Sequence, residues 1–220
     1  MAVAERTTPP STPPPRQRPR LSIIVAAVAV ACVLAVLAGA FALTRTSDEA
    51  PAAAPPGPAA DPVDVGFATD MLDHHQQALQ MALLANDKGT TTPVRTLAVK
   101  MIVAQQSESG RFLQYLEERG RPQGDPDRTV MGWMGMPVPR ARMPGLASPQ
   151  ELLQLTNASG IDVDRLFLDL MVRHHEGGVH MAEYAAEHAT NEPLRDAAGR
   201  MAVMQQREIA DMQQLRSGLG

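Results

Sequence analysis

Two stretches of the chain, FATDMLDHHQQALQMA (residues 67–82) and FLDLMVRHHEGGVHMA (residues 167–182), decide the fold. Each contains a His-His pair with one Met three residues before it and another Met six residues after it, and the two copies lie 100 positions apart. An ordinary packed core does not require this pattern. The repeat therefore indicates common ancestry of the two segments, a shared chemistry, or both.

The repeated unit is longer than the motif, because the same offset relates MIVAQQSE (residues 101–108) to MAVMQQRE (residues 201–208). Pairs such as Asp61-Pro62 and Thr92-Pro93 are typical helix starts, and Ser148 to Glu151 fits a capping box. We expect long helices over about 62–87, 92–118, 162–189 and 192–216, a short helix from 148, and no strands. Neither helical hairpin can bury its apolar face alone, so the pattern predicts an all-α, pseudo-twofold four-helix bundle built from two hairpins.

The N-terminal part of the sequence predicts a membrane anchor. Residues 21–43 form a run of 23 without a charge, preceded by arginines and followed by SDEA. Such a run is long enough to span a bilayer, and the arginines place the N-terminus in the cytoplasm. The predicted order is a Pro/Arg-rich cytoplasmic tail (1–20), a single transmembrane helix (21–43), a Pro/Ala-rich linker (44–60) and an extracytoplasmic domain (61–220). A cleaved signal peptide is the alternative, and the domain would then be secreted.

Composition excludes several classes of function. The net charge is −4, so no basic field indicates nucleic-acid binding. Aromatic residues make up 3% of the chain, which argues against a β-sandwich or barrel. The one cysteine, Cys32, lies in the apolar run, so the outer domain has neither a disulfide nor a thiolate ligand.

Helical spacing places both His-His pairs on the inward face of their helices. With about 100° per residue, each motif forms a stripe of roughly 120°, the width of a core-facing side. On the partner helices a Met, a Gln and a Glu share a face at i, i+4 and i+7. The bundle interior should therefore hold four imidazoles, several thioethers and two carboxylates. His180 should point outward, and His188 lies at the edge of the stripe.

Two interpretations of these inward polar groups are open. The histidines could simply form hydrogen bonds across the bundle, or they could bind a metal ion, which the duplication and the flanking methionines favour. Imidazole with thioether and no cysteine suits copper, above all Cu(I), whereas zinc on histidine alone is a further option. A di-iron oxidase would need Glu-x-x-His turns, which the chain lacks, so an enzymatic role has less support. Besides copper binding and an oxidase, the third functional hypothesis is a helical module that binds no metal and interacts with a partner.

The methionine-rich loop at residues 119–147 adds a second, weaker signal. Its sequence MGWMGMPVPRARM could hold Cu(I) between thioethers and the Trp133 ring, or it could be a hydrophobic lid on one end of the bundle. The weaker candidate ligands, in this loop and on the helices, are Met101, Glu108, Met201, Glu208, Met131, Met134, Met136, Met143 and His188.

The paired motifs, the MIVAQQSE and MAVMQQRE segments and the Met/Gly-rich linker resemble the bacterial domain-of-unknown-function family numbered 305, over about residues 62–216. The resemblance implies a ferritin-like, all-helical, extracytoplasmic bundle, and the family includes secreted copper-binding proteins of the CopM type. For the chain itself we expect as partners the membrane through the N-terminal helix, a metal ion and copper-handling proteins. Gly177-Gly178 departs from the Gly-Ala of a more typical member. Carried over by position, the candidate metal ligands are His74, His75, Met71, Met81, His174, His175, Met171 and Met181.

Overall fold

A computed structural model describes residues 61–121 and 127–220, and the predicted tail, membrane span and linker (1–60) lie outside these residues. The four long helices are α2 (Pro62–Lys88), α3 (Thr92–Glu117), α5 (Ile161–His188) and α6 (Glu192–Ser217). Their bounds agree with the prediction to within about two residues, so the all-α prediction is confirmed. Within the described ranges, no helix combines the length and apolarity needed to cross a membrane.

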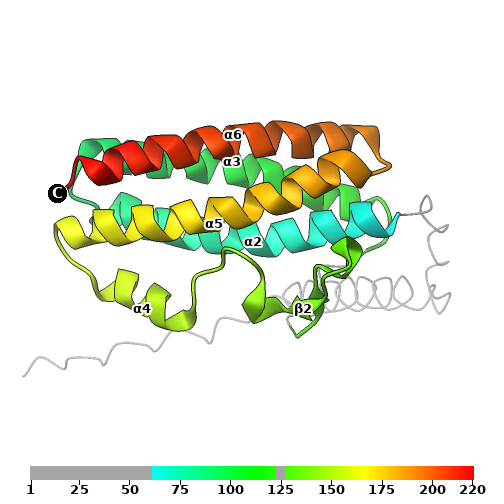
Figure 1. Cartoon of the computed structure of the whole chain (residues 1–220), viewed down its shortest axis with the longest axis horizontal. Coiled ribbons are helices and arrows are strands. Elements are labelled where there is room, and N and C mark those ends of the chain that lie inside the picture. Colours follow the sequence, from blue (N-terminus) through cyan, green and yellow to red (C-terminus); the bar gives the residue numbers. More distant parts are fainter. Residues whose placement is uncertain (1–60, 122–126) are drawn as a thin grey trace, which may run out of the picture. The chain divides into compact units, whose positions relative to one another are not determined.

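The four helices form two antiparallel hairpins that meet along α2 and α5 (Figure 1). Helix α2 pairs with α3, and α5 pairs with α6. The hairpins are also tied together at their ends by two equivalent carboxylates. Asp64 accepts hydrogen bonds from the backbone N–H groups of Thr190 and Asn191, and Asp164 accepts them from Thr90 and Thr91. These reciprocal contacts give the bundle the predicted pseudo-twofold arrangement.

The helix starts follow from local sequence, with one difference. Asp61 caps α2 through a hydrogen bond from the N–H of Val63, and Ser148 with Glu151 forms the predicted capping box of α4 (Pro149–Asn157). Helix α3, in contrast, has Thr91 at its N-cap rather than the expected Thr92. The Thr91 side chain makes no capping hydrogen bond. The Asp164 carboxylate from the other hairpin instead fixes the chain just before the helix, where it accepts hydrogen bonds from the N–H groups of Thr90 and Thr91.

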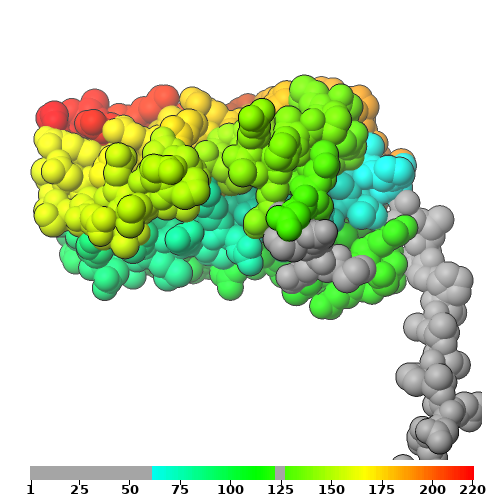
Figure 2. Space-filling model, turned by 90° about the horizontal axis from the view of Figure 1, so that it is seen from below, coloured from blue at the N-terminus to red at the C-terminus, as the bar shows by residue number. Residues whose placement is uncertain are grey.

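The segment between the hairpins crosses one face of the α2–α5 pair, as Figure 2 shows from below. It contains the short 3-10 helices η1 (Gly132–Met134) and η2 (Arg140–Arg142), followed by α4. The expectation of no strands was wrong here, since β1 (Thr129–Val130) and β2 (Val138–Pro139) form a two-stranded antiparallel ladder. Two-residue strands carry no periodicity in the sequence, so only the folded loop reveals them.

Candidate metal centre

The four paired histidines lie together at the centre of the bundle. His74, His75, His174 and His175 are each at most 1% exposed. The rings of His74 and His174 pack against each other where α2 crosses α5, with their centroids 3.7 Å apart. The structure therefore joins the two motifs in one layer, which we call the histidine layer and define by these four residues.

Hydrogen bonds determine which nitrogen of each ring carries the proton. Nε2 of His174 lies 3.0 Å from the carbonyl oxygen of His74, and Nε2 of His74 lies 3.3 Å from that of Pro144. Nε2 of His75 lies 2.9 Å from Glu108, and Nε2 of His175 lies 2.8 Å from Glu208. Carbonyl and carboxylate oxygens only accept hydrogen bonds, so Nε2 is the donor in every ring.

The other nitrogen of each ring, Nδ1, is consequently unprotonated and carries a lone pair, and it lies in the buried interior. All four Nδ1 atoms are buried, and none has a hydrogen-bond partner among the described residues. A buried polar atom without a partner costs on the order of 1–3 kcal/mol, so four in one layer call for an explanation. A neutral imidazole with its second nitrogen bonded to a carboxylate is the common arrangement of a metal-binding histidine.

Burial keeps the central rings uncharged. Desolvation, reinforced by the neighbouring imidazoles of His75 and His175, lowers the pKa of His74 to about 3. The same causes, together with the ring of His74, hold the pKa of His174 well below its usual value. Both rings are therefore neutral at physiological pH, which is the protonation state that binds a metal.

Buried methionines lie on both sides of the histidine layer. Because α2 and α5 are antiparallel, each motif contributes one Met to each side: Met71 shares an apolar cluster with Met181, and Met81 shares the opposite cluster with Met171. The partner helices add Met201 to the first cluster and Met101 to the second. The predicted imidazole and thioether ligands are therefore neighbours along the bundle axis, and each apolar cluster contains one methionine from each of the two motifs.

The weaker candidates divide into buried and exposed residues. Three loop methionines, Met131, Met134 and Met143, pack into the first apolar cluster, as the hydrophobic-lid interpretation expects, whereas Met136 is 45% exposed. His188, whose position was ambiguous, is exposed and stacks on Tyr184. Within residues 61–121 and 127–220, no group of three or more His, Cys, Asp or Glu side chains is arranged to hold a metal ion by itself.

Two polar residues of the interior were not among the predicted ligands. Gln105 and Gln205 are at most 4% exposed, and the Oε1 atom of each has no hydrogen-bond partner in the described structure. They follow Met101 and Met201 by four residues, so the spacing that placed the methionines inward identifies them too. Each side chain adds an amide oxygen to the polar groups of the bundle interior.

The loop is fastened to α2 over the histidine layer. Asp70 accepts hydrogen bonds from the N–H of Met131 (2.7 Å) and from Nε1 of Trp133 (2.8 Å), and it pairs with Arg128. Gln77 bonds to both the N–H and the carbonyl group of Ala147. The sequence alone gave no signal for these contacts, because Asp70 reads as one more polar residue in a helix.

Different close contacts explain why positions 177 and 178 are glycine. A Cβ on Gly177 would lie 2.2 Å from the carbonyl oxygen of Pro144, where the loop backbone crosses α5. A Cβ on Gly178 would meet Oε1 of Gln205 at 2.4 Å, the movable end of a side chain. The glycine pair thus allows close approach of the loop and of Gln205.

Because Gly177 meets backbone and Gly178 meets a side chain, alanine at the two positions should change stability by different amounts. Gly177→Ala should destabilise the protein by about 1–3 kcal/mol through overpacking, since backbone must move. Gly178→Ala should change stability by less than about 1 kcal/mol, because Gln205 can turn aside and alanine favours the helix. Urea unfolding of the two variants measures both values. Equal losses in both would contradict the assignment of the backbone contact to Gly177.

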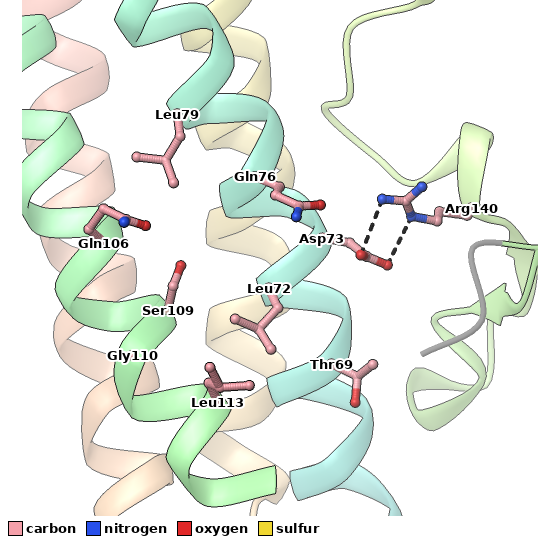
Figure 3. A pocket seen from close by; sticks show the side chains of 10 residues that line it. All are labelled: Thr69, Leu72, Asp73, Gln76, Leu79, Gln106, Ser109, Gly110, Leu113 and Arg140. Carbon is pink, nitrogen blue, oxygen red and sulfur yellow. Dashed lines mark hydrogen bonds and ion pairs between the residues drawn. The ribbon is translucent and has the colours of Figure 1, made fainter. Parts of the chain in front are cut away.

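A groove on the outside of the α2–α3 hairpin is separate from this centre (Figure 3). It has a volume of about 430 Å³, and Leu72, Leu79 and Leu113 line it. The Asp73–Arg140 ion pair, at 2.9 Å, closes one side, as the dashed lines show. No residue of the histidine layer lines this groove, so its chemistry is independent of the imidazoles.

The fold and this centre define a class of all-helical proteins with a duplicated histidine motif in the bundle core. The family described as "Domain of unknown function (DUF305)" matches residues 64–216, and the chain belongs to this family, as its motifs predicted. No curated protein matches the chain.

Solved structures of relatives have the same fold. A DUF305 protein from Streptomyces coelicolor is 36% identical, with a TM-score of 0.68 over 74% of this chain and 96% of that one. A DUF305 fragment from Deinococcus radiodurans is 30% identical, with a TM-score of 0.63 over 73% of this chain and 99% of that one. That fragment consists almost wholly of the matched region, so a bundle of this family folds without further sequence. CopM in the Cu(I)-bound form is 25% identical, with a TM-score of 0.53 over 70% of this chain and 96% of that one.

Proposed function

We propose that this protein binds copper, as Cu(I), in the core of its bundle, and that it sequesters the ion or passes it on outside the cytoplasm. The observation that carries the proposal is the set of four buried imidazoles whose Nδ1 lone pairs have no partner in the described structure. The copper-bound state of CopM, at 25% identity, supports a copper-related role for this fold.

The donor set fits Cu(I) better than other common ions. Neutral imidazole nitrogen and thioether sulfur are soft or borderline ligands, and the histidine layer lies between two apolar clusters that contain buried methionines. Calcium and magnesium need several oxygen ligands, whereas the side chains gathered in this part of the described bundle offer mainly imidazole nitrogen and thioether sulfur. His75 and His175, with Met71, Met81, Met171 and Met181 on either side, are the ligands we expect to bind the metal together with His74 and His174.

Glu108 and Glu208 have a supporting role in this proposal. Each accepts a hydrogen bond from Nε2 of a histidine, which orients the ring and makes Nδ1 a better electron donor. Both inward carboxylates are thus already paired with imidazoles. This pairing favours binding of a soft ion over the oxidase alternative, in which glutamates themselves bind the metal.

We also propose that residues 21–43 anchor the protein in the cell membrane as a single span, with the bundle on the extracytoplasmic side. Support comes from the length of the uncharged run and the arginines before it. The full chain should stay with membranes during alkaline carbonate extraction. Release into the soluble fraction would favour a cleaved signal and a secreted bundle.

A competition titration tests the copper proposal. Residues 61–220 are titrated with Cu(I) under anaerobic conditions against a coloured Cu(I) chelator. The Glu108→Gln/Glu208→Gln variant should bind Cu(I) about 10–100-fold more weakly, because the supporting carboxylates are lost. A variant with all four histidines of the layer replaced by glutamine should lose more than that. The matched control replaces the outward-facing His180 and His188 in the same way and should bind like wild type.

The control separates the core from the surface. If the core variants fold, as judged by circular dichroism, and still bind Cu(I) like wild type, the histidine layer is not the copper site. If the His180/His188 variant is the one that weakens, the copper is bound by surface histidines and the proposal is wrong.

A further inference from the structure

A row of aromatic rings connects the histidine layer to the surface. From the interior outward it runs through His75, Phe112, Phe67, Trp133, Tyr184 and His188. Successive ring centroids are 5.9, 5.4, 5.8, 5.5 and 4.0 Å apart. His75, Phe112 and Phe67 are buried, Trp133 and Tyr184 are half-buried, and His188 is exposed. We call this series the ring row.

The ring row is unusual for this chain because aromatic residues are scarce. The sequence has four Phe, two Tyr and one Trp, and four of these seven residues belong to the row. The row runs from α2 and α3 through the loop to α5, and the second repeat has no equivalent of it. Position 212, which corresponds to Phe112, is a methionine, and Phe167, which corresponds to Phe67, lies in the opposite apolar cluster. Random packing of a symmetric core would not favour one side in this way.

Trp133 is held in place by two independent contacts. Its Nε1 donates a hydrogen bond to the buried carboxylate of Asp70, at 2.8 Å. Its ring lies directly on Gly66, where an added Cβ would come within 2.4 Å of the indole carbons. The corresponding position in the second repeat is Leu166, so the space for the indole is specific to this hairpin.

We propose that the ring row transfers an electron between copper bound at the histidine layer and a one-electron acceptor at the surface formed by Tyr184 and His188. This inference rests on the proposed copper function. Copper on buried imidazoles is out of contact with any acceptor in solution, so an electron must pass through protein. Indole and phenol are the side chains of the row that are most easily oxidised, and Phe67 and Phe112 fill the space between Trp133 and His75.

The electron balance is simple, and no bond is made or broken. The acceptor takes one electron from Trp133 by way of Tyr184 and is reduced. Cu(I) then returns one electron to Trp133 and becomes Cu(II). Trp133 keeps its proton throughout, because the carboxylate of Asp70 that accepts its N–H hydrogen bond also stabilises the transient positive charge on the indole. The net reaction is the oxidation of one Cu(I) by one equivalent of acceptor.

Photogenerated tris(bipyridine)ruthenium(III), a one-electron acceptor that is strong enough to oxidise indole and too large to enter the core, tests the proposal. Residues 61–220 loaded with one equivalent of Cu(I) are mixed with the ruthenium(II) complex and an oxidative quencher without oxygen, and the growth of the Cu(II) signal after a light flash gives the rate. Trp133→Phe and Phe112→Leu should slow oxidation several-fold and leave Cu(I) affinity unchanged. Phe112→Leu removes the ring without adding a thioether beside His75. Phe167→Leu, which removes a buried ring outside the row, is the control and should react like wild type.

Electron paramagnetic resonance gives a second readout. Photo-oxidation of Trp133 should give a persistent indole radical in the copper-free protein. With Cu(I) bound, the radical should disappear as a Cu(II) signal grows, and Phe112→Leu should slow this exchange. Oxidation at the wild-type rate in both Trp133→Phe and Phe112→Leu, with normal Cu(I) affinity, would overturn the ring row alone. A wild-type protein that binds no Cu(I) would instead overturn the proposed function and this inference together.

Discussion

Lowering the pH from 7 to 5 should destabilise the copper-free bundle by about 2 kcal/mol through His74, and His174 should add a loss of the same sign. The pKa of His74 falls to about 3 in the folded state, and that of His174 is also well below its ordinary value of 6.5. At pH values below 6.5 but above the lowered folded-state pKa values, the unfolded chain binds protons at the two rings and the folded chain does not. Stability due to these groups is therefore complete above pH 6.5 and is lost as the pH falls towards 3.

Urea unfolding at a series of pH values, with a chelator present, measures this slope. The window from pH 7 to 5 lies above the titration range of most carboxylates, so these contribute little. His74→Gln/His174→Gln should show a clearly smaller pH dependence over the window than wild type, whereas the exposed pair His180→Gln/His188→Gln should keep the wild-type slope. A wild-type slope in the first variant would show that the two central rings are not buried as uncharged imidazoles.

Asp70→Ala should cost about 3 kcal/mol, at the lower end of the range for breaking a buried ion pair. The carboxylate is 1% exposed and binds Arg128, the N–H of Met131 and the indole N–H of Trp133. Its removal leaves three donors without their acceptor. The effect stays at the low end because Arg128 keeps a second contact, at 2.7 Å, with Asp73.

Thermal or urea unfolding of Asp70→Ala gives the loss, and the fluorescence of the one tryptophan reports the loop directly. We expect the emission of Trp133 to shift to the red as the indole becomes solvated. The control is Asp169→Ala, which removes a 53% exposed carboxylate from its ion pair with Arg216 and should cost at most about 1 kcal/mol. Equal effects of the two substitutions would contradict the role of Asp70 as the anchor of the loop.

The sequence was sufficient for the bundle because its signals are local and repeated. Helical spacing placed His74, His75 and their equivalents inward, and duplication implied that the hairpins pack on each other. Both predictions rest on the spacing of residues along the sequence, which can be analysed without knowledge of the tertiary fold. The single metal-site residue whose position was left ambiguous, His188, lies at the edge of its stripe, where periodicity gives no answer.

The arrangement within the core needed three-dimensional information. Spacing does not say that α2 and α5 run antiparallel in contact, so it could not predict that His74 stacks on His174 or that Met71 lies in the cluster of Met181. The contacts of the loop could not be predicted from the sequence either, because they join Asp70 and Gln77 to residues 58 to 70 positions away. Both features depend on tertiary packing, which hydrophobic patterns determine only through the complete fold.

The central claim is that copper binds at the buried imidazoles with thioether support. The most direct measurement is the X-ray absorption spectrum, at the copper edge, of residues 61–220 loaded with one equivalent of Cu(I). The structure predicts a Cu(I) ion coordinated by both imidazole nitrogen and methionine sulfur, with the sulfur contribution reduced in Met71→Leu/Met181→Leu or in Met81→Leu/Met171→Leu. A spectrum with oxygen ligands only, or one unchanged when the four histidines are replaced, would contradict the account.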